Sequence, residues 1–179
     1  MKSKNFFLLM AVFALLSSSV VTGQESNIAE PEYIGVVYHL DSSGKMEALD
    51  RQRFRYRVGL KALGFGGGKV TADLEGKSAA LRVASDEKIS FVVQLPYGSD
   101  PRKIQLFSFV VKDGNRQIVM TSGSVFKGQT PTLPIQLNIT RFGQNSYKLT
   151  PAAGLAVGEY AFIAENSVDL FCFGVDKKD

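Results

Sequence analysis

Four arginines recur at every second position near residue 54, and they are the side chains of this chain best suited to binding chemistry. This arginine row consists of Arg51, Arg53, Arg55 and Arg57. On a β-strand, side chains two residues apart lie about 7 Å apart on one face. Guanidinium groups at that spacing can bind carboxylates, phosphates or sulfates by paired hydrogen bonds. They can also form a solvated face that pairs with acidic residues of a neighbouring strand, such as Asp73 and Glu75.

Residue types that commonly perform catalysis are sparse. His39 is the only histidine, so a Ser-His-Asp or Cys-His arrangement would have to use it. Its alternation with Tyr38 and Leu40 predicts that it lies on the outer face of a strand. Cys172 is the only cysteine and lies in an apolar run, so we expect a buried, inert thiol. One histidine and one cysteine do not supply the ligands of a stable zinc site. We therefore expect no catalytic residue, no metal and no cofactor.

The glycine-rich segment 64–69 (GFGGGK) only superficially resembles a phosphate-binding loop. Leu63 stands where such a loop has its first glycine, and Val70 stands where it has serine or threonine. The residues that follow alternate like a strand instead of starting a helix, whose N-terminal amides would bind the anion. The segment is therefore predicted to be a flexible connection between strands.

Alternation of apolar and polar residues dominates the rest of the chain, and it predicts that strands position these groups. In the run 53–61, the arginines face one way and four apolar residues face the other, namely Phe54, Tyr56, Val58 and Leu60. The run 104–111 is apolar on both faces, which predicts a central strand covered on both sides. About nine or ten short strands without a long helical period predict an all-β fold. The expected architecture is an antiparallel β-sandwich of the immunoglobulin-like or transthyretin-like kind.

The first 23 residues have the three parts of an export signal. Two lysines come first, and residues 6–16 then form an apolar run that is too short for the roughly 20 residues of a membrane span. We expect cleavage after Gly23, or alternatively near Ala29. A flexible lead at 24–32 and a single domain at 33–179 would remain. The signal holds two lysines and no acid, so the net charge falls from +4 to +2, which does not favour a nucleic-acid partner.

Two features concern where the protein acts. A single cysteine allows no intramolecular disulfide, which favours a bacterial periplasmic or cell-surface protein over a small eukaryotic secreted domain. The segments 155–164 (LAVGEYAFIA) and 171–176 (FCFGVD) resemble the ending of exported β-sandwich proteins of Bacteroides-like bacteria. The pattern L-x-x-G-E-Y is also similar to a turn and strand in transthyretin-like and immunoglobulin-like modules, where the tyrosine packs inward. This resemblance implies a β-sandwich in a cell-envelope setting and transfers no catalytic residue.

Together these patterns predict an exported, non-enzymatic protein, periplasmic or at the cell surface, that binds an envelope protein or a surface glycan. No transmembrane span is expected after signal cleavage. One alternative is a carbohydrate-binding accessory module, in which the arginine row would favour acidic glycans. The chain has no tryptophan, so Tyr33 and Tyr97 are the candidates for stacking on a sugar. Another alternative is a secreted inhibitor or assembly subunit that presents the loop at 62–69. An unfamiliar enzyme would need a deep cleft lined by at least two acids.

Overall fold

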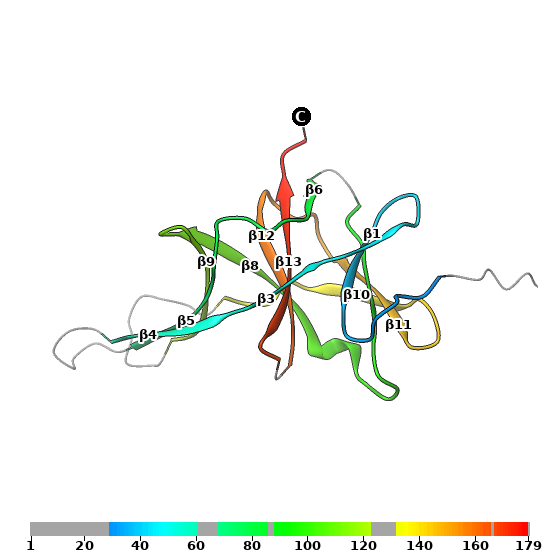
Figure 1. Ribbon diagram of the computed structural model, residues 1–179, viewed down its shortest axis with the longest axis horizontal. Coiled ribbons are helices and arrows are strands. Elements are labelled where there is room, and N and C mark those ends of the chain that lie inside the picture. Colours follow the sequence, from blue (N-terminus) through cyan, green and yellow to red (C-terminus); the bar gives the residue numbers. More distant parts are fainter. Residues whose placement is uncertain (1–28, 61–67, 86–87, 123–131, 166, 179) are drawn as a thin grey trace, which may run out of the picture.

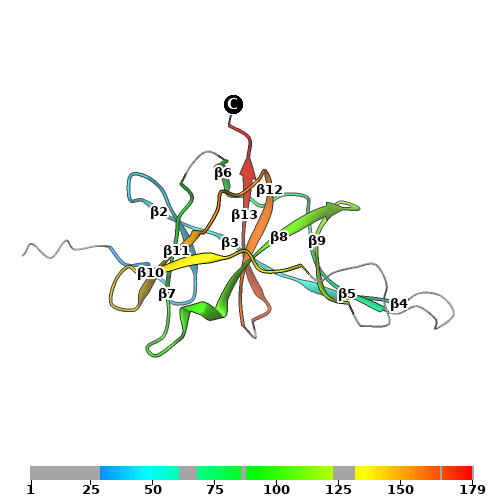
Figure 2. The same cartoon turned by 180° about the vertical axis from the view of Figure 1, so that it is seen from behind.

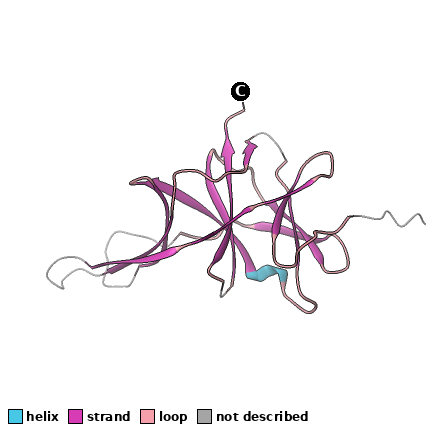
Figure 3. Ribbon diagram, viewed as in Figure 1, coloured by secondary structure: helices cyan, strands magenta, loops and turns pink. Residues whose placement is uncertain are grey.

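The computed structural model describes residues 29–60, 68–85, 88–122, 132–165 and 167–178, which form strands and one short 3-10 helix (Figure 3). The expected signal at 1–23 lies outside the described residues, as does most of the glycine-rich segment. The elements, in chain order, are β1 (Val37–Leu40), β2 (Met46–Ala48), β3 (Asp50–Arg53), β4 (Arg55–Leu60), β5 (Gly68–Leu74), β6 (Arg82–Ala84), β7 (Phe91–Gln94), η1 (Pro101–Lys103), β8 (Ile104–Lys112), β9 (Asn115–Ser122), β10 (Leu137–Arg141), β11 (Ser146–Pro151), β12 (Gly158–Ala164) and β13 (Asp169–Asp176).

Two largely antiparallel sheets pack against each other, which confirms the predicted all-β sandwich. The five-stranded sheet has the order β10-β11-β7-β1-β2. The eight-stranded sheet has the order β3-β13-β12-β8-β9-β5-β4, with β6 beside β13 in the one parallel pairing between its described strands. The described strands outnumber the nine or ten expected partly because some are very short: β2 and β6 have only three residues each. Three residues are too few for alternation to predict a strand reliably.

One stretch of chain contributes to both edges of the eight-stranded sheet. β3 pairs with β13 at one edge, and β4 pairs with β5 at the other. Phe54 alone separates β3 from β4, so the sheet curls almost into a barrel (Figure 1). The sequence predicts an unbroken strand here. The structure has two strands instead, because the chain changes its partner strand at Phe54, whose half-buried ring packs inside the curl.

The curl creates two apolar cores, one on each face of β12 and β13. In the inter-sheet core, Phe162 and Phe173 pack against Phe91 of the five-stranded sheet. In the inner core, Ala161 and Cys172 pack against strands β5, β8 and β9 on the inside of the curl. Because successive side chains of a strand point to opposite faces, β12 and β13 are buried on both.

The prediction that residues 104–111 are covered on both sides is confirmed only in part, because buried residues of β8 reach Phe109 but Gln105 and Ser108 among them are exposed. Leu106 lies in the inter-sheet core and Phe109 lies in the inner core. Val110 and Val111 are exposed, because the β8–β9 hairpin extends past the five-stranded sheet (Figure 2). Among the residues that the structure describes, no helical segment has the length and apolar character of a membrane span.

Candidate functional site

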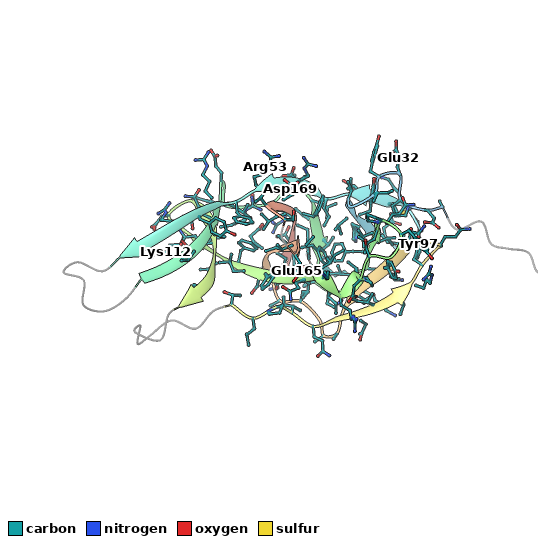
Figure 4. All side chains as sticks on the ribbon, turned by 90° about the horizontal axis from the view of Figure 1, so that it is seen from below. Glu32, Arg53, Tyr97, Lys112, Glu165 and Asp169 are labelled. Carbon is teal, nitrogen blue, oxygen red and sulfur yellow. The ribbon has the colours of Figure 1, made fainter. Side chains whose placement is uncertain are left out.

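The arginine row lies along β3 and β4, with two members on each side of Phe54. Arg51 Nε and Arg53 Nε lie 3.7 Å and 3.2 Å from carboxylate oxygens of Asp169, at the start of β13 (Figure 4). Arg57 Nε lies 2.9 Å from Asp73 Oδ2, on the neighbouring strand β5. Arg55 forms no ion pair with any carboxylate in the described part of the chain.

These pairings leave the row with an excess of positive charge. Asp73 is one of the partners that the sequence suggested, whereas Asp169 lies 116 positions from Arg53 and was not expected. Two paired carboxylates face four guanidinium groups. The paired arginines keep more than half of their side-chain surface exposed, so these ion pairs contribute little to stability. The guanidinium groups therefore remain accessible to an anionic ligand.

Three of the four arginines border a single surface depression of about 440 Å3. Arg51 is not among the lining residues. The lining consists of Arg53, Arg55, Tyr56, Arg57, Asp73, Leu74, Glu75 and Asn115. The depression therefore combines guanidinium donors with carboxylate acceptors, one side-chain amide and one aromatic ring.

Tyr56 is the member of this site that the sequence pattern concealed. The alternation assigns it to the core, and its register places it opposite the fully buried Ala72. Its side chain is nevertheless 61% exposed, because the β4–β5 hairpin projects from the body of the molecule (Figure 1). The ring packs edge-on against Phe54, with the ring centres 4.7 Å apart and the planes at 82°. This contact fixes the orientation of an exposed aromatic surface beside the arginines.

The two tyrosines expected to be exposed lie elsewhere. Tyr33 and Tyr97 are exposed as predicted. Tyr97 lies well away from Arg53, the arginine of the depression that Figure 4 labels. Neither tyrosine lines the depression. The residues near Tyr33 also contact the domain, since Glu30 accepts a hydrogen bond from Gln144 N at 2.7 Å. Of these three tyrosines, Tyr56 is the one that borders the depression.

Asp73 has the most unusual environment in the depression. Only 7% of the residue is exposed. Despite the proximity of Arg57, neither carboxylate oxygen is in hydrogen-bond geometry with a donor from the described residues. An ionised carboxylate has about four acceptor sites. Asp73 thus lines the depression, but both of its oxygens are buried without a hydrogen-bond donor among the described residues.

A second group of charged residues lies inside the curled sheet. Arg116 of β9 is only 1% exposed, and it donates hydrogen bonds to Gln52 Oε1 at 2.6 Å and to Gly76 O at 3.2 Å. Its Nη1 lies 3.9 Å from the buried carboxylate of Glu159, which also accepts a hydrogen bond from Ala79 N at 2.8 Å. These contacts link three strands and the segment between β5 and β6, which is a structural role.

Gly174 leaves space for the Arg82 side chain, which also binds Glu159 of this group. It pairs with Glu159 on one side and with Arg82 on the other. A Cβ at Gly174 would overlap the Arg82 guanidinium, which crosses this position to bind Glu159. Arg82 also binds Asp176, with Nε 2.9 Å from Oδ2, and this hydrogen bond lowers the pKa of the Asp176 carboxyl. The close approach of the Arg82 guanidinium therefore explains the glycine at position 174.

Cys172 is fully buried, as predicted, and burial raises its pKa to about 11. The sequence neighbours gave no sign of the Arg116 guanidinium, whose charge opposes this rise. At pH 8 we expect native Cys172 to react with an aromatic disulfide reagent at least about 100-fold more slowly than the unfolded chain, because both the thiolate fraction and access are reduced. Absorbance of the released thiol measures both rates. Equal rates with and without denaturant would contradict the buried placement.

The prediction for His39 is wrong. It pairs with Phe91, a residue of the inter-sheet core, and the two ring centres lie 5.8 Å apart. His39 is half-buried on the core side of β1 instead of lying on the outer face. The alternation was misleading because Val37 and Tyr38, on opposite faces, are both buried. Within the described ranges, no three His, Cys, Asp or Glu side chains gather as a metal site.

The environment of Tyr160 agrees with the expectation that it packs inward. The ring is buried in the inter-sheet core, and its hydroxyl donates a hydrogen bond to Ala156 O at 2.7 Å. Burial raises the pKa of this hydroxyl.

Comparison of the chain with models of known protein families, with curated proteins and with solved structures gave no match.

Proposed function

We propose that this chain is an exported, non-enzymatic binding protein that holds an anionic partner on the arginine row. The observation that supports this function is the convergence of Arg53, Arg55 and Arg57 on one depression. Arg55 has no carboxylate partner in the described residues, so its guanidinium is available for a bidentate contact with a carboxylate, phosphate or sulfate. The export signal expected at 1–23 supports a periplasmic or cell-surface setting.

The acidic groups of the depression support binding over catalysis. Asp73 is the second-last residue of β5 and Glu75 directly follows this strand, so the two acids of the depression come from one short stretch of chain. A pair of carboxyl groups that cleaves a glycosidic bond must flank that bond. The arginines contribute only hydrogen-bond donors, which suits them to holding an anion. The depression can orient and hold a ligand without reacting with it.

Titration with labelled dextran sulfate tests the binding site. The triple variant Arg53→Gln/Arg55→Gln/Arg57→Gln is expected to bind the polymer at least about tenfold more weakly at low salt. The slope of log K against log salt should also become shallower by roughly two to three, since each lost contact releases about one fewer counterion. Fluorescence anisotropy at several salt concentrations measures both quantities.

A control variant separates the site from the overall charge. Lys45→Gln/Arg102→Gln/Lys103→Gln removes the same three charges from exposed positions that do not line the depression. It should retain affinity within about twofold of the parent protein, because distant exposed charges act only through a screened field. If both triple variants lose affinity equally, or if the parent protein does not bind the polymer, the arginine row is not the binding site.

The secreted inhibitor or assembly subunit remains a separate prediction. It depends on the loop at 62–69, and most of that loop lies outside the described residues. Pull-down from envelope extracts, with and without the loop, distinguishes this role from binding at the arginine row.

A further inference from the structure

The depression presents two kinds of group that a simple inorganic anion cannot satisfy together. Arg53, Arg55 and Arg57 donate hydrogen bonds and attract negative charge, whereas Asp73 and Glu75 accept hydrogen bonds and repel it. A phosphate or sulfate chain has acceptors only, so it would satisfy the arginines but be repelled by the carboxylates. A complementary ligand carries negative charge together with hydroxyl donors.

Asp73 provides independent evidence for such a donor. Its carboxylate is buried, lines the depression, and has no hydrogen-bond donor in suitable geometry among the described residues. Leaving a buried charged acceptor without its hydrogen bonds costs free energy. The two oxygens have almost no solvent-accessible surface, so a ligand hydroxyl recovers this cost once the side chains around Asp73, such as the neighbouring Arg57, rearrange. Asn115 adds a side-chain amide that can both donate and accept at the same wall.

Tyr56 provides a surface for the apolar part of the same ligand. Its ring is exposed, borders the depression and is held in position by Phe54. An aromatic face of this kind suits the C–H face of a sugar ring, for which phosphate and sulfate chains have no equivalent. The volume of about 440 Å3 falls in the usual range of small-molecule sites, about 300–1,000 Å3.

We infer that the depression is a subsite for an acidic saccharide. Arg55 binds the acidic group of the sugar, Asp73 and Glu75 accept hydrogen bonds from sugar hydroxyls, and Tyr56 stacks on the ring. Arg53 and Arg57 lie on either side of Arg55 and contact the neighbouring charges of the polymer. This inference rests on the proposed function and specifies its ligand class.

Three probes separate sugar recognition from charge recognition. Oligogalacturonate carries both sugar rings and carboxylates, its methyl ester keeps the rings without the charge, and tripolyphosphate carries charge without rings. Isothermal titration calorimetry is expected to show oligogalacturonate binding at least about tenfold more tightly than either of the others, because only this probe satisfies both the arginines and the carboxylates.

Two variants test the assigned roles. Tyr56→Ala should weaken oligogalacturonate binding by about five- to tenfold and leave tripolyphosphate binding unchanged, since only the sugar stacks. Asp73→Asn should weaken oligogalacturonate binding and strengthen tripolyphosphate binding, because it removes an acceptor for hydroxyls together with a repulsive charge. Tyr97→Ala, which truncates an exposed tyrosine outside the depression, is the control and should change neither.

The outcomes distinguish this inference from the proposed function. If tripolyphosphate binds as tightly as oligogalacturonate, or if Tyr56→Ala changes neither affinity, the saccharide subsite is refuted while anion binding stands. If no anionic probe, dextran sulfate included, binds the protein, both proposals fail. Tyr56 is exposed, so its replacement remains informative even where Asp73→Asn does not fold.

Discussion

Replacing Phe173 with alanine is expected to lower the free energy of unfolding by about 3–5 kcal/mol. The side chain is fully buried in the inter-sheet core. Its ring centre lies 4.6 Å from that of Phe91, 5.4 Å from Tyr160 and 5.9 Å from Phe162. Truncation removes these contacts and leaves a cavity between the two sheets. Because the chain has no tryptophan, urea unfolding followed by circular dichroism provides the measurement.

Tyr97→Ala is the matched control for Phe173→Ala. It also truncates an aromatic residue, but Tyr97 is 94% exposed. The free energy of unfolding should therefore change by no more than about 0.5 kcal/mol. A comparable loss for both variants would mean that Phe173 does not hold the sheets together and that the packing of β13 between two cores is incorrect.

Glu159→Ala is also expected to have a large effect and to lower the free energy of unfolding by about 3–5 kcal/mol. This substitution removes the acceptor of the buried Ala79 N–H and one partner of Arg82. It also leaves the Arg116 guanidinium inside the curled sheet without the nearby carboxylate. The cost comes mainly from the buried donors that remain unpaired. Urea unfolding of the purified variant measures this loss.

Glu165→Ala is the control for Glu159→Ala. Glu165 forms an ion pair with Lys103, with the two charged atoms 2.8 Å apart, but 54% of its side chain is exposed. Water replaces the lost partner, so a change of at most about 1 kcal/mol is expected. If Glu159→Ala costs no more than Glu165→Ala, the buried charges do not hold the curled sheet together.

The strand content and the arginine row could be predicted from local alternation, because a period of two places side chains on opposite faces of a strand. The interruption between β3 and β4 at Phe54 could not be predicted in this way. Phe54 continues the alternation of its neighbours, and only the change of partner from β13 to β5 identifies it. The prediction for His39 was wrong for a related reason. Alternation predicts a strand with one buried face, whereas both faces of β1 carry buried residues.

The composition of the site was only partly predictable. The neighbouring strand suggested Asp73 as a partner of the row, and the structure pairs it with Arg57. Asp169 is far away in sequence and is brought close by the pairing of β13 with β3. Tyr56 was assigned to the core because it alternates with the arginines. It is exposed in the structure because the β4–β5 hairpin projects from the molecule, and alternation does not indicate how far the body of the molecule extends. Such features depend on tertiary structure.

The change of partner strand at Phe54 links ligand binding to the stability of the fold. β13 holds one half of this segment and β5 holds the other, so the orientation of Arg53 relative to Arg55 depends on both strand pairings. A ligand held by both arginines would therefore bind best while both pairings are intact. By mass action it would suppress local opening of either pairing in proportion to its saturation.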